Sequence, residues 1–404
     1  MQMKVLIAHN AYQQRGGEDA VVAAEARLLE ERGHRVIFYR RFNDELRDGG
    51  PFAAISAGIE TIWAENSYRA LKQLLLQERP EVAHFHNTVP LISPAAYYAC
   101  SDVGVPVVQT LHNYRLLCPG GQFLRNGQVC ESCLARSVPW PGVAHACYRG
   151  SRLATAAVSA MLTLHRVKGT WQGKVDVYVA LSEFARNKFI EGGLPAERIV
   201  VKPNSVDFDC GERTVTGEYA LFIGRHSEEK GLRILIEAWR RRREQIPLRI
   251  VGDGPLRREV EREAERHGMV GISFLGQLPP GETQEQMRGA RFLLYPSIWY
   301  EGFPLAVAEA FACGVPVVCS RLGSLEEIVQ DRGTGLHFHA GDPEDLASKV
   351  EWAWAHPAEM EEMGRAARLE YESKYTPERN HEALLQIYER AACSVKCATR
   401  QYAQ

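Results

Sequence analysis

The chain has 404 residues, of which 45% are hydrophobic and 24% charged, and its formal net charge is −2. This balance excludes collagen, coiled coil and a generally basic nucleic-acid binder, and the length predicts two or three domains. No apolar run approaches the roughly 18–20 residues of a membrane span, and the first residues lack the pattern of a secretory signal.

Short apolar runs alternate with helical patterns throughout the first half. They predict strands at 4–8, 35–39, 82–86, 105–111, 175–181 and 199–202. Helical patterns lie between them, at 19–31, 56–78, 94–101, 151–170 and 183–191. Because the runs are apolar on both faces, they indicate buried parallel strands that helices cover.

The second half repeats this scheme. Strands are predicted at 219–223, 248–251, 272–275, 292–295, 315–319 and 335–338, and helices at 230–245, 255–267, 304–313, 324–329 and 343–355. Asp342 and Thr376 each precede a proline, as a helix cap does. Residues 202–207 separate the two series as a linker. Two such series predict two doubly wound α/β domains with a cleft between them.

Two cations follow the first strand of the second series. Arg225 and Lys230 come directly after Gly224, beside the start of the next helix. A helix N-terminus offers unpaired N–H groups and a positive dipole end, which suit a diphosphate. Two surface cations on an exposed loop explain the spacing equally well.

Two carboxylates flank the start of a later helix. Glu301 lies in the loop after a strand, Gly302 allows a close backbone approach, Pro304 can open the helix, and Glu309 lies on it. Carboxylates bind sugar and ribose hydroxyls, so this pair could hold a nucleotide sugar at two points. The alternative is a turn and an amphipathic helix with a solvated Glu309. Against it, the helix is almost wholly apolar, and burying a lone carboxylate is costly.

These motifs resemble those of the retaining GT-B glycosyltransferases of family 4 type, over roughly residues 4–390. The most specific element is Glu-Gly-Phe-Pro-Leu-x-x-x-Glu at 301–309, followed by Gly-Arg-x-x-x-x-Lys-Gly at 224–231. The resemblance implies an α/β GT-B fold, with two doubly wound Rossmann-like domains facing across a cleft. It implies an N-terminal acceptor-side domain at 1–203, a C-terminal donor-nucleotide-binding domain at 204–375, a C-terminal helix packing back on the N-terminal domain at 376–391, and a tail at 392–404.

The resemblance also implies what individual residues do. Arg225 and Lys230 would bind the donor diphosphate, Glu309 the donor ribose and Glu301 the sugar hydroxyls. Arg15-Gly16-Gly17-Glu18 resembles the family's N-terminal glycine loop, although an ordinary turn is an equally good interpretation of the residues alone. The donor-binding set is then Gly16, Gly17, Gly224, Arg225, Lys230, Gly254, Gln277, Glu301, Gly302, Phe303, Pro304, Leu305 and Glu309. Of these, Gly254 lies in a common turn sequence, and Gln277 lies where backbone contacts would select the base.

Thr110-Leu111-His112-Asn113 resembles the family's Thr-x-His-Asp motif, whose histidine lies near the donor sugar. Asn113 stands where the family has Asp, so no carboxylate role carries over. His84 and His86 end another strand and either line the cleft or are hydrogen-bonded core histidines.

The resemblance implies transfer with retention at the anomeric carbon. Because no carboxylate pair is evident for double displacement, a front-face mechanism is expected, in which the leaving diphosphate takes the acceptor proton. The expected catalytic residues are His112, Arg225, Lys230 and Glu301. No cofactor is required, and we interpret Asp207-Phe208-Asp209 as a hinge rather than a metal site, so activity should be insensitive to EDTA.

Four of the 10 cysteines cluster in the predicted loop 118–147, namely Cys118, Cys130, Cys133 and Cys147. The spacing is compatible with a structural zinc site, with free thiols and, less readily in a cytosolic chain, with two disulfides. The remaining cysteines of the two domains are expected to be isolated core or linker residues: Cys100, Cys210, Cys313 and Cys319.

Basic residues occur in two further places. Arg240 to Arg243 close a predicted helix, which favours a solvated helix end over nucleic-acid contact. Residues 152–174 carry an apolar face with Arg and Lys near its end; a core-packed helix is favoured over one that lies on a membrane. Residues 1–205 contain 23 Lys and Arg and 18 Asp and Glu, an excess of five positive charges. This excess is either chance variation between the two domains or an adaptation to an anionic membrane or acceptor.

The sequence therefore predicts a hexosyltransferase that uses a UDP- or GDP-sugar and a glycan or lipid-linked glycan acceptor, in polysaccharide or glycoconjugate biosynthesis. It is expected in the cytoplasm, with peripheral contact to the inner face of the plasma membrane left open, and without nucleic-acid partners. The alternatives are a GT-B sugar-nucleotide epimerase, a dinucleotide-dependent oxidoreductase and a zinc-stabilised scaffold that only binds sugar nucleotides. The absence of Gly-x-Gly-x-x-Gly after the first strand disfavours the oxidoreductase.

Overall fold

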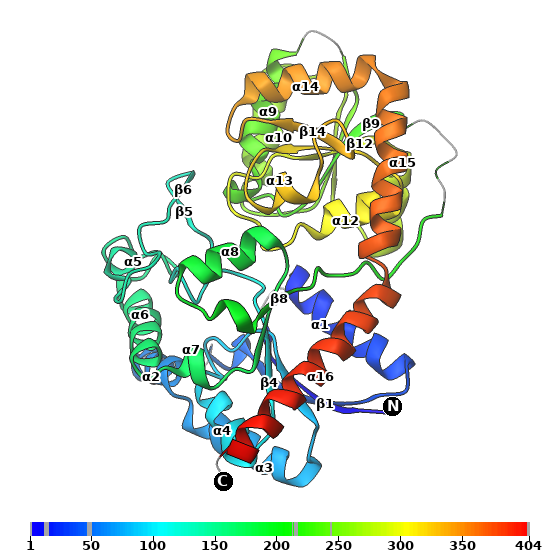
Figure 1. The fold of residues 1–404 in the computed structure, drawn as a ribbon. Helices are drawn as coiled ribbons and strands as arrows, with labels where there is room; N and C mark the ends of the chain where they lie inside the picture. Colours follow the sequence, from blue (N-terminus) through cyan, green and yellow to red (C-terminus); the bar gives the residue numbers. More distant parts are fainter. Residues whose placement is uncertain are drawn as a thin grey trace. The chain divides into compact units, whose positions relative to one another are not determined.

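The computed structural model describes residues 2–11, 16–46, 51–211, 213, 217–242 and 245–401, with the side chains of 46, 51–56 and 395–401 left aside. Predictions that name Arg15, Arg243 and residues 402–404 lie outside this range. The chain divides into two compact units (Figure 1). Unit 1 comprises Met1–Phe123, Cys130–Asn204 and Pro377–Gln404, and unit 2 comprises Leu124–Val129 and Ser205–Thr376.

Unit 1 contains a six-stranded parallel sheet in the order β2-β1-β3-β4-β7-β8. The strands are β1 (Lys4–Ala11), β2 (Arg35–Phe42), β3 (Val82–Phe85), β4 (Val107–Thr110), β7 (Val177–Ala180) and β8 (Ile199–Val201), so all six predicted strands are confirmed. β3, β4 and β7 are buried along their whole length, which explains their unbroken apolar runs. The chain order reverses between β1 and β3, and ligands of such sheets bind at this kind of reversal.

The helices of unit 1 are α1 (Gly17–Glu31), α2 (Pro51–Ile62), α3 (Glu65–Glu78), α4 (Ala95–Val103), α5 (Trp140–Ala144), α6 (Arg152–Val167), α7 (Thr170–Gly173), α8 (Glu183–Glu191) and α16 (Pro377–Gln401), with short 3-10 turns at Asn43–Leu46 and Ala196–Arg198. The single helix predicted at 56–78 is wrong, because the chain breaks at Trp63 and Ala64 into α2 and α3. The backbone N–H of Ala64 instead bonds to the Ser93 hydroxyl, at 2.8 Å.

The C-terminal helix belongs to unit 1, where α16 lies beside α1 (Figure 1). Leu384, Ile387 and Tyr388 enter the core with Val22 and Leu29 of α1. The helix continues to Gln401, whereas the sequence predicted a tail from 392. Once a helix is anchored by its apolar face, each added residue contributes a hydrogen bond at little entropic cost, so Ala391 and Ala392 extend it.

Unit 2 contains a second parallel sheet in the order β11-β10-β9-β12-β13-β14. Its strands are β9 (Tyr219–Ile223), β10 (Leu248–Val251), β11 (Ile272–Gly276), β12 (Ala290–Tyr295), β13 (Val317–Ser320) and β14 (Gly335–Phe338), which confirms every predicted strand. The order is that of a dinucleotide-binding sheet, with the reversal between β9 and β12. A two-stranded hairpin, β5 (Leu124–Arg125) and β6 (Gln128–Val129), was not predicted.

The helices of unit 2 are α9 (Leu232–Arg241), α10 (Arg257–Arg266), α11 (Pro280–Gly289), α12 (Leu305–Ala312), α13 (Ser324–Ile328), α14 (Pro343–Ala355) and α15 (Pro357–Lys374). Asp342 caps α14 as predicted, since its side chain accepts from the N–H groups of Glu344 and Asp345. Arg240 and Arg241 at the end of α9 pair with Glu237. Among the residues described, no helix is long and apolar enough to cross a membrane.

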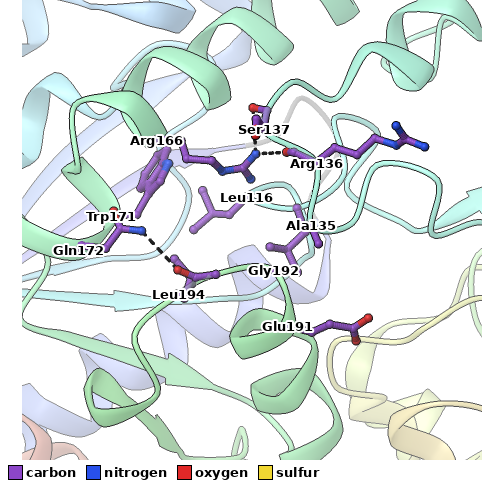
Figure 2. Close-up of a pocket in the computed structure, with 12 residues that line it drawn as sticks. Leu116, Ala135, Arg136, Ser137, Arg166, Trp171, Gln172, Glu191, Gly192 and Leu194 are labelled. Carbon is purple, nitrogen blue, oxygen red and sulfur yellow. Dashed lines mark hydrogen bonds between the residues drawn. The ribbon is translucent and has the colours of Figure 1, made fainter.

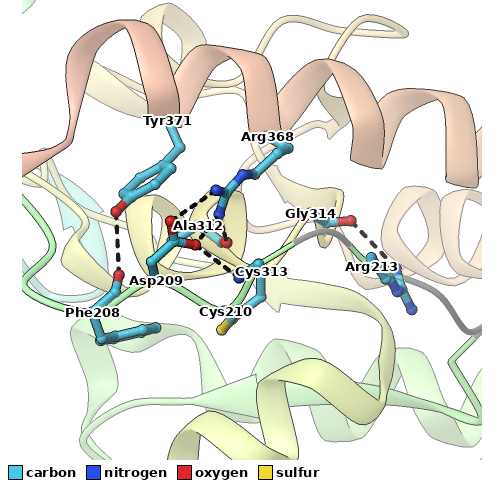
Figure 3. Close-up of a disulfide and its surroundings, with 10 residues drawn as sticks. Phe208, Asp209, Cys210, Arg213, Ala312, Cys313, Gly314, Arg368 and Tyr371 are labelled. Atoms are coloured by element: carbon cyan, nitrogen blue, oxygen red, sulfur yellow. Dashed lines mark hydrogen bonds and ion pairs between the residues drawn. A yellow bond between two sulfur atoms is a disulfide. The ribbon is translucent and has the colours of Figure 1, made fainter.

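Cys210 and Cys313 form a disulfide with an S–S distance of 2.05 Å, so the prediction that they are isolated is wrong. The segment that carries Cys210 lies against the end of α12 and against α15 (Figure 3). Arg368 donates to Asp209 at 2.9 Å, and these hydrogen bonds lower the pKa of the Asp209 carboxyl. An arginine thus holds the second carboxylate of the Asp-Phe-Asp string.

Candidate active site

Lys230 and Glu301 meet at the point where the sheet of unit 2 reverses its order. Lys230 ends the short turn Glu228–Lys230 after β9, and Glu301 follows β12, the neighbouring strand. The Lys230 ammonium lies 2.7 Å from Glu301 Oε1 and 3.0 Å from the Tyr295 hydroxyl. Because parallel strands have their carboxyl ends at the same edge of the sheet, Lys230 and Glu301 are in contact although they lie 71 positions apart in the sequence.

The Glu301 carboxylate is buried, with 4% of the residue exposed. Its Oε1 also accepts from the Ser297 hydroxyl at 2.7 Å and from the Trp299 indole N–H at 2.8 Å. Burial disfavours the Lys230 ammonium, but the charge of Glu301 and the Tyr295 hydroxyl outweigh it and raise the pKa of Lys230. The site therefore holds a fixed cation at neutral pH.

Sequence reasoning missed Tyr295, Ser297 and Trp299. All three lie in the strand and loop that precede Glu301, within the segment already singled out. The available signal was a hydroxyl and two aromatic residues close in sequence to the Glu301 carboxylate. Lys230 Nζ also lies over the Tyr295 and Trp299 rings, 5.3 and 5.6 Å from their centroids.

Two glycines bring the surrounding loops close together. Gly231 has φ +69°, and a Cβ there would lie 1.8 Å from the Pro296 carbonyl oxygen, so only glycine fits between the two loops. Gly254 has φ +158°, and a Cβ would lie 2.6 Å from the His226 carbonyl oxygen. The Gly-Asp-Gly-Pro turn at residues 252–255 therefore packs directly against the loop that carries Arg225.

Glu309 lies half-buried on α12. Burial, with the nearby Asp207 carboxylate, raises the pKa of Glu309 to about 7. In the part of the chain that the structure describes, its carboxyl makes no hydrogen bond or ion pair. Near neutral pH the protonated and charged forms of Glu309 are thus similarly populated. Hydroxyl groups that donate hydrogen bonds to the carboxylate would stabilise the charged form.

The other predicted donor residues of unit 2 lie on the loops around these groups. Arg225 is exposed and forms no ion pair among the residues described, and Gln277 is exposed directly after Gly276 at the end of β11. Phe303 packs against Tyr375, with ring centroids 5.7 Å apart. Pro304 is the N-cap of α12 rather than its first residue. Gly302 and Leu305 are partly exposed beside it, and Gly224 follows β9.

Unit 1 holds a second cluster, at the carboxyl ends of β1, β3 and β4. His112 Nε2 lies 2.8 Å from His86 Nδ1, and His86 Nε2 lies 3.8 Å from Glu25 Oε2. Lys202 in turn donates to Glu25 Oε1 at 2.6 Å. Lys202 was predicted to begin the linker, but the structure buries it against α1.

Burial keeps the histidines of this cluster neutral. It lowers the pKa of His112 to about 3 and that of His84 to about 4, although Glu25 partly opposes it. His86 Nε2 and Glu25 Oε2 have no hydrogen-bond partner among the described residues, and their proximity favours the tautomer with the proton on His86 Nε2. His86 Nδ1 then accepts from His112, which leaves His112 Nδ1 as an acceptor.

Gly16 and Gly17 open α1, with Gly16 as its N-cap. Asp19 accepts from the Gly16 backbone N–H at 2.9 Å, and its other carboxylate oxygen lies 2.9 Å from His9 Nε2. Two acidic residues, Glu18 and Asp19, thus stand in the first turn. That Gly16 and Gly17 face a diphosphate stays a prediction.

One set of three ligand atoms lies within 4.8 Å of one another among the described residues, from Glu25, His84 and His86. It does not suit a cation, because Lys202 already pairs with Glu25. Both ring nitrogens of His84 are also engaged, with the Tyr388 hydroxyl at 2.9 Å and the Thr110 hydroxyl at 2.7 Å. The set is a hydrogen-bonded cluster.

None of the four cysteines of the predicted loop forms a disulfide in the structure. Burial, together with the nearby thiols of Cys118, Cys147 and Cys130, raises the pKa of Cys133 to about 11. The loop therefore gathers the four cysteines around Cys133, although no three of their sulfur atoms come within 4.8 Å of one another.

Comparison with known proteins links both units to glycosyl transfer. The family model described as Glycosyltransferase Family 4 matches residues 15–209, and the model described as Glycosyl transferases group 1 matches residues 211–370. Together they span nearly the whole described chain.

Two relatives are bacterial transferases. The O-antigen chain mannosyltransferase B of Escherichia coli is 31% identical over 51% of this chain and 60% of its own length. The D-rhamnosyltransferase WbpZ of Pseudomonas aeruginosa is 29% identical over 43% of this chain and 46% of its own length. The chain thus matches about half the length of these curated relatives.

Solved structures share the whole fold. Anabaena HepE, crystallised with UDP and glucose, superposes with a TM-score of 0.69 at 17% identity, over 96% of this chain and 100% of that one. The sucrose-phosphate synthase of Thermosynechococcus elongatus has the same TM-score and identity, over 97% of this chain. The architecture is therefore GT-B.

Proposed function

Because the chain belongs to the GT-B glycosyltransferases of family 4 type, we propose that it transfers a sugar from a nucleotide-diphosphate sugar to a glycan or lipid-linked glycan, with retention at the anomeric carbon. The observation that carries this proposal is the Lys230–Glu301 pair at the reversal of the sheet of unit 2. HepE, solved with UDP, and the O-antigen mannosyltransferase support a UDP- or GDP-sugar of the hexose type and a role in glycoconjugate biosynthesis.

Lys230 is suited to stabilise the leaving diphosphate. An ammonium has three N–H groups, of which two point to Glu301 and Tyr295. The third is available to a phosphate oxygen, and 20% of the side chain is exposed. Glu301 fixes the cation before the reaction begins, so little reorganisation is needed as charge develops. Arg225 would add a second, exposed cation.

His112 keeps its predicted role of positioning the sugar as part of this proposal. Its imidazole stays neutral over the physiological range, since its pKa is about 3. A neutral ring can orient hydroxyls by hydrogen bonds without opposing the positive charge that develops at the anomeric carbon.

The transfer itself tests the function. The protein is incubated with UDP- and GDP-hexoses and a lipid-linked glycan, and NMR follows the nucleoside diphosphate and the new glycosidic bond. We expect product with the anomeric configuration of the donor. An inverted product would overturn retention, free epimerised sugar would indicate an epimerase, and nucleotide binding without turnover on any acceptor would indicate a scaffold.

Glu309→Gln should weaken nucleotide binding at least tenfold, since a hydrogen bond to a charged group contributes about 1.5–3 kcal/mol. Because the carboxylate is the form that accepts two hydroxyls, the affinity of the wild type should increase as pH rises through about 7, and that of the variant should not. Titration calorimetry measures both, with Glu362→Gln on α15 as the matched control.

The same variant has an opposite effect on stability. The folded pKa of Glu309, about 7, exceeds its ordinary value of 4.5, so its stabilising contribution is complete below pH 4.5 and is lost as pH rises through 7. Glu309→Gln should therefore gain melting temperature relative to the wild type as pH rises. A pH-independent difference in both affinity and melting temperature would contradict this account of Glu309.

We also propose a structural zinc ion at Cys118, Cys130, Cys133 and Cys147, with no metal or cofactor required for catalysis. The support is the Cys-x-x-Cys pair Cys130 and Cys133, with Cys118 and Cys147 in the same loop and near the Cys133 thiol. Binding one ion would require the four sulfur atoms to move closer together than they are in the structure. Protein purified without chelator should contain one zinc per chain, which Cys133→Ser loses and Cys100→Ser keeps. Zinc below about a tenth of an equivalent in the wild type would remove the proposal and favour free thiols.

A cytoplasmic enzyme that acts on a lipid-linked acceptor would meet its substrate at a membrane. We therefore propose that the protein is cytoplasmic and makes peripheral contact with the inner face of the plasma membrane. We propose no nucleic-acid partner, because the net charge of the chain is −2.

A further inference from the structure

Residues 132–175 contain six Lys and Arg and no Asp or Glu. The cations are Arg136, Arg149, Arg152, Arg166, Lys168 and Lys174. None of them forms an ion pair within the part of the chain that the structure describes. The acids at either end of the segment are engaged elsewhere, because Glu131 pairs with Lys188 and Asp176 accepts from the Val107 backbone N–H. The segment therefore carries a net positive charge, which Asp102 beside Lys174 partly offsets.

The same segment exposes apolar side chains. Five of the ten large hydrophobic residues that are exposed in the described chain lie between 138 and 167. Leu153 is 86% exposed, Val167 is 82% exposed and Trp140 is 58% exposed. Exposed apolar side chains gathered in one segment are typical of an interaction site.

Between α5 and α6, four of these five side chains, all but Leu153, border an apolar groove of about 640 Å³. Trp140 and Val143 line it from α5, and Ala160, Leu164 and Val167 from α6. α5 and α6 lie side by side in unit 1 (Figure 1). The apolar residues of α6 recur at helical spacing along 16 residues, about 24 Å of helix.

Arg166 joins α6 to the loop before α5. Its guanidinium donates to the carbonyls of Arg136 and Ser137 beside a smaller cavity of about 240 Å³ (Figure 2). In this view the guanidinium of Arg136 points away from that cavity. Arg166 thus links α6 to the loop before α5, and Val138 of that loop lines the groove.

We propose that this surface, formed by α5, α6 and the loop before α5, binds a bilayer that contains anionic phospholipid. The exposed apolar residues of α6, which are Leu153, Leu164 and Val167, would enter the boundary between headgroups and acyl chains. The cations of the segment that form no ion pair would contact lipid phosphates. Trp140 suits this depth, since an indole has an apolar body and a polar N–H. Only the biological purpose of this membrane contact, the capture of a lipid-linked acceptor, rests on the proposed function.

The charge complementarity decides between possible occupants. A second copy of the chain would bring the same cations into the interface and leave them facing one another. An anionic bilayer supplies both the opposite charge and the apolar layer that the groove and these apolar residues require.

Co-sedimentation of the full chain with phosphatidylcholine vesicles, with and without phosphatidylglycerol, tests the proposal. We expect binding only when phosphatidylglycerol is present, with affinity falling as salt rises. The pair Arg149→Gln and Arg152→Gln should bind about thirtyfold more weakly, from about 1 kcal/mol for each cation. Leu153→Ser with Val167→Ser should also lose binding; both positions are exposed, so the fold should tolerate them.

Matched controls lie on α15 of unit 2, where Leu369 and Arg365 are exposed. Leu369→Ser and Arg365→Gln should bind vesicles as the wild type does. Equal binding by all variants, or none by the wild type, would overturn the proposal. A dimer that dissociates in the Leu153→Ser, Val167→Ser variant, without vesicle binding, would assign the surface to a second copy.

Vesicle binding needs neither donor nor acceptor, so this test is separate from that of the proposed function. If the protein bound vesicles but no nucleotide, the proposed transferase function would be rejected and the proposed membrane-binding surface would be retained.

Discussion

Lys230→Ala should lower kcat by about 10²–10³-fold, the loss typical of removing one preorganised donor from a developing negative charge. Lys230 is the half-buried cation at the reversal of the sheet of unit 2, held by Glu301 at 2.7 Å. Its removal should affect kcat more than KM, because the charge on the diphosphate oxygen increases as the bond to the sugar breaks. Steady-state kinetics of nucleoside diphosphate release measure the effect.

The substitution also removes one of the donors to the Glu301 carboxylate, so the melting temperature has to be measured beside kcat. Ser297 and Trp299 still donate to Glu301, which should keep the variant folded. Lys374→Ala, on the exposed end of α15, is the matched control. A folded Lys230→Ala protein with a nearly unchanged kcat would remove Lys230 from the mechanism.

Lys202→Met should lower the free energy of unfolding by about 3–5 kcal/mol, since it leaves the Glu25 carboxylate buried without its partner. Lys202 Nζ lies 2.6 Å from Glu25 Oε1, and both side chains are at most 3% exposed. Urea denaturation measures the loss. The double variant Glu25→Gln, Lys202→Met should recover most of it, because it buries no charge.

The pair also predicts a pH dependence. Burial opposes ionisation of Glu25, but Lys202 outweighs it, and the pKa of Glu25 falls below its ordinary value of 4.5. The corresponding stability is present above pH 4.5 and is lost as pH falls through the folded pKa. In Lys202→Met this loss at low pH should disappear. A Lys202→Met variant as stable as the wild type would contradict this account, and one as stable as the double variant would show that the unpaired Glu25 carboxylate is not costly.

The two sheets could be predicted from the sequence because a buried parallel strand is apolar on both faces and ends at a turn. α11 and α15 lacked a comparable signal. In α11, Met287 is the only buried residue, so its sequence shows no periodic apolar face. In α15 the buried residues Met360, Met363, Gly364, Ala367 and Tyr371 recur at helical spacing, but Glu361, Glu362 and Arg365 stand between them and only three of the five are large and apolar.

The members of the candidate site could be named from the sequence, but their contacts could not. Lys230 and Glu301 were identified in separate loops, and only the strand order of the sheet brings them together. The same holds for Lys202 and Glu25, 177 positions apart, and for the disulfide between Cys210 and Cys313. Sequence spacing carries no information on such pairs, because strand order is set by tertiary packing.

Binding of a nucleoside diphosphate by unit 2 is the central claim, and thermal shift with UDP, GDP, ADP, CMP and NAD tests it most directly. At about 100 times the dissociation constant, binding adds about 2.7 kcal/mol, enough to raise the melting temperature by several degrees. We predict that one nucleoside diphosphate stabilises the wild type and that Glu309→Gln greatly reduces this shift. A response to NAD alone, or to none of the five, would contradict the account.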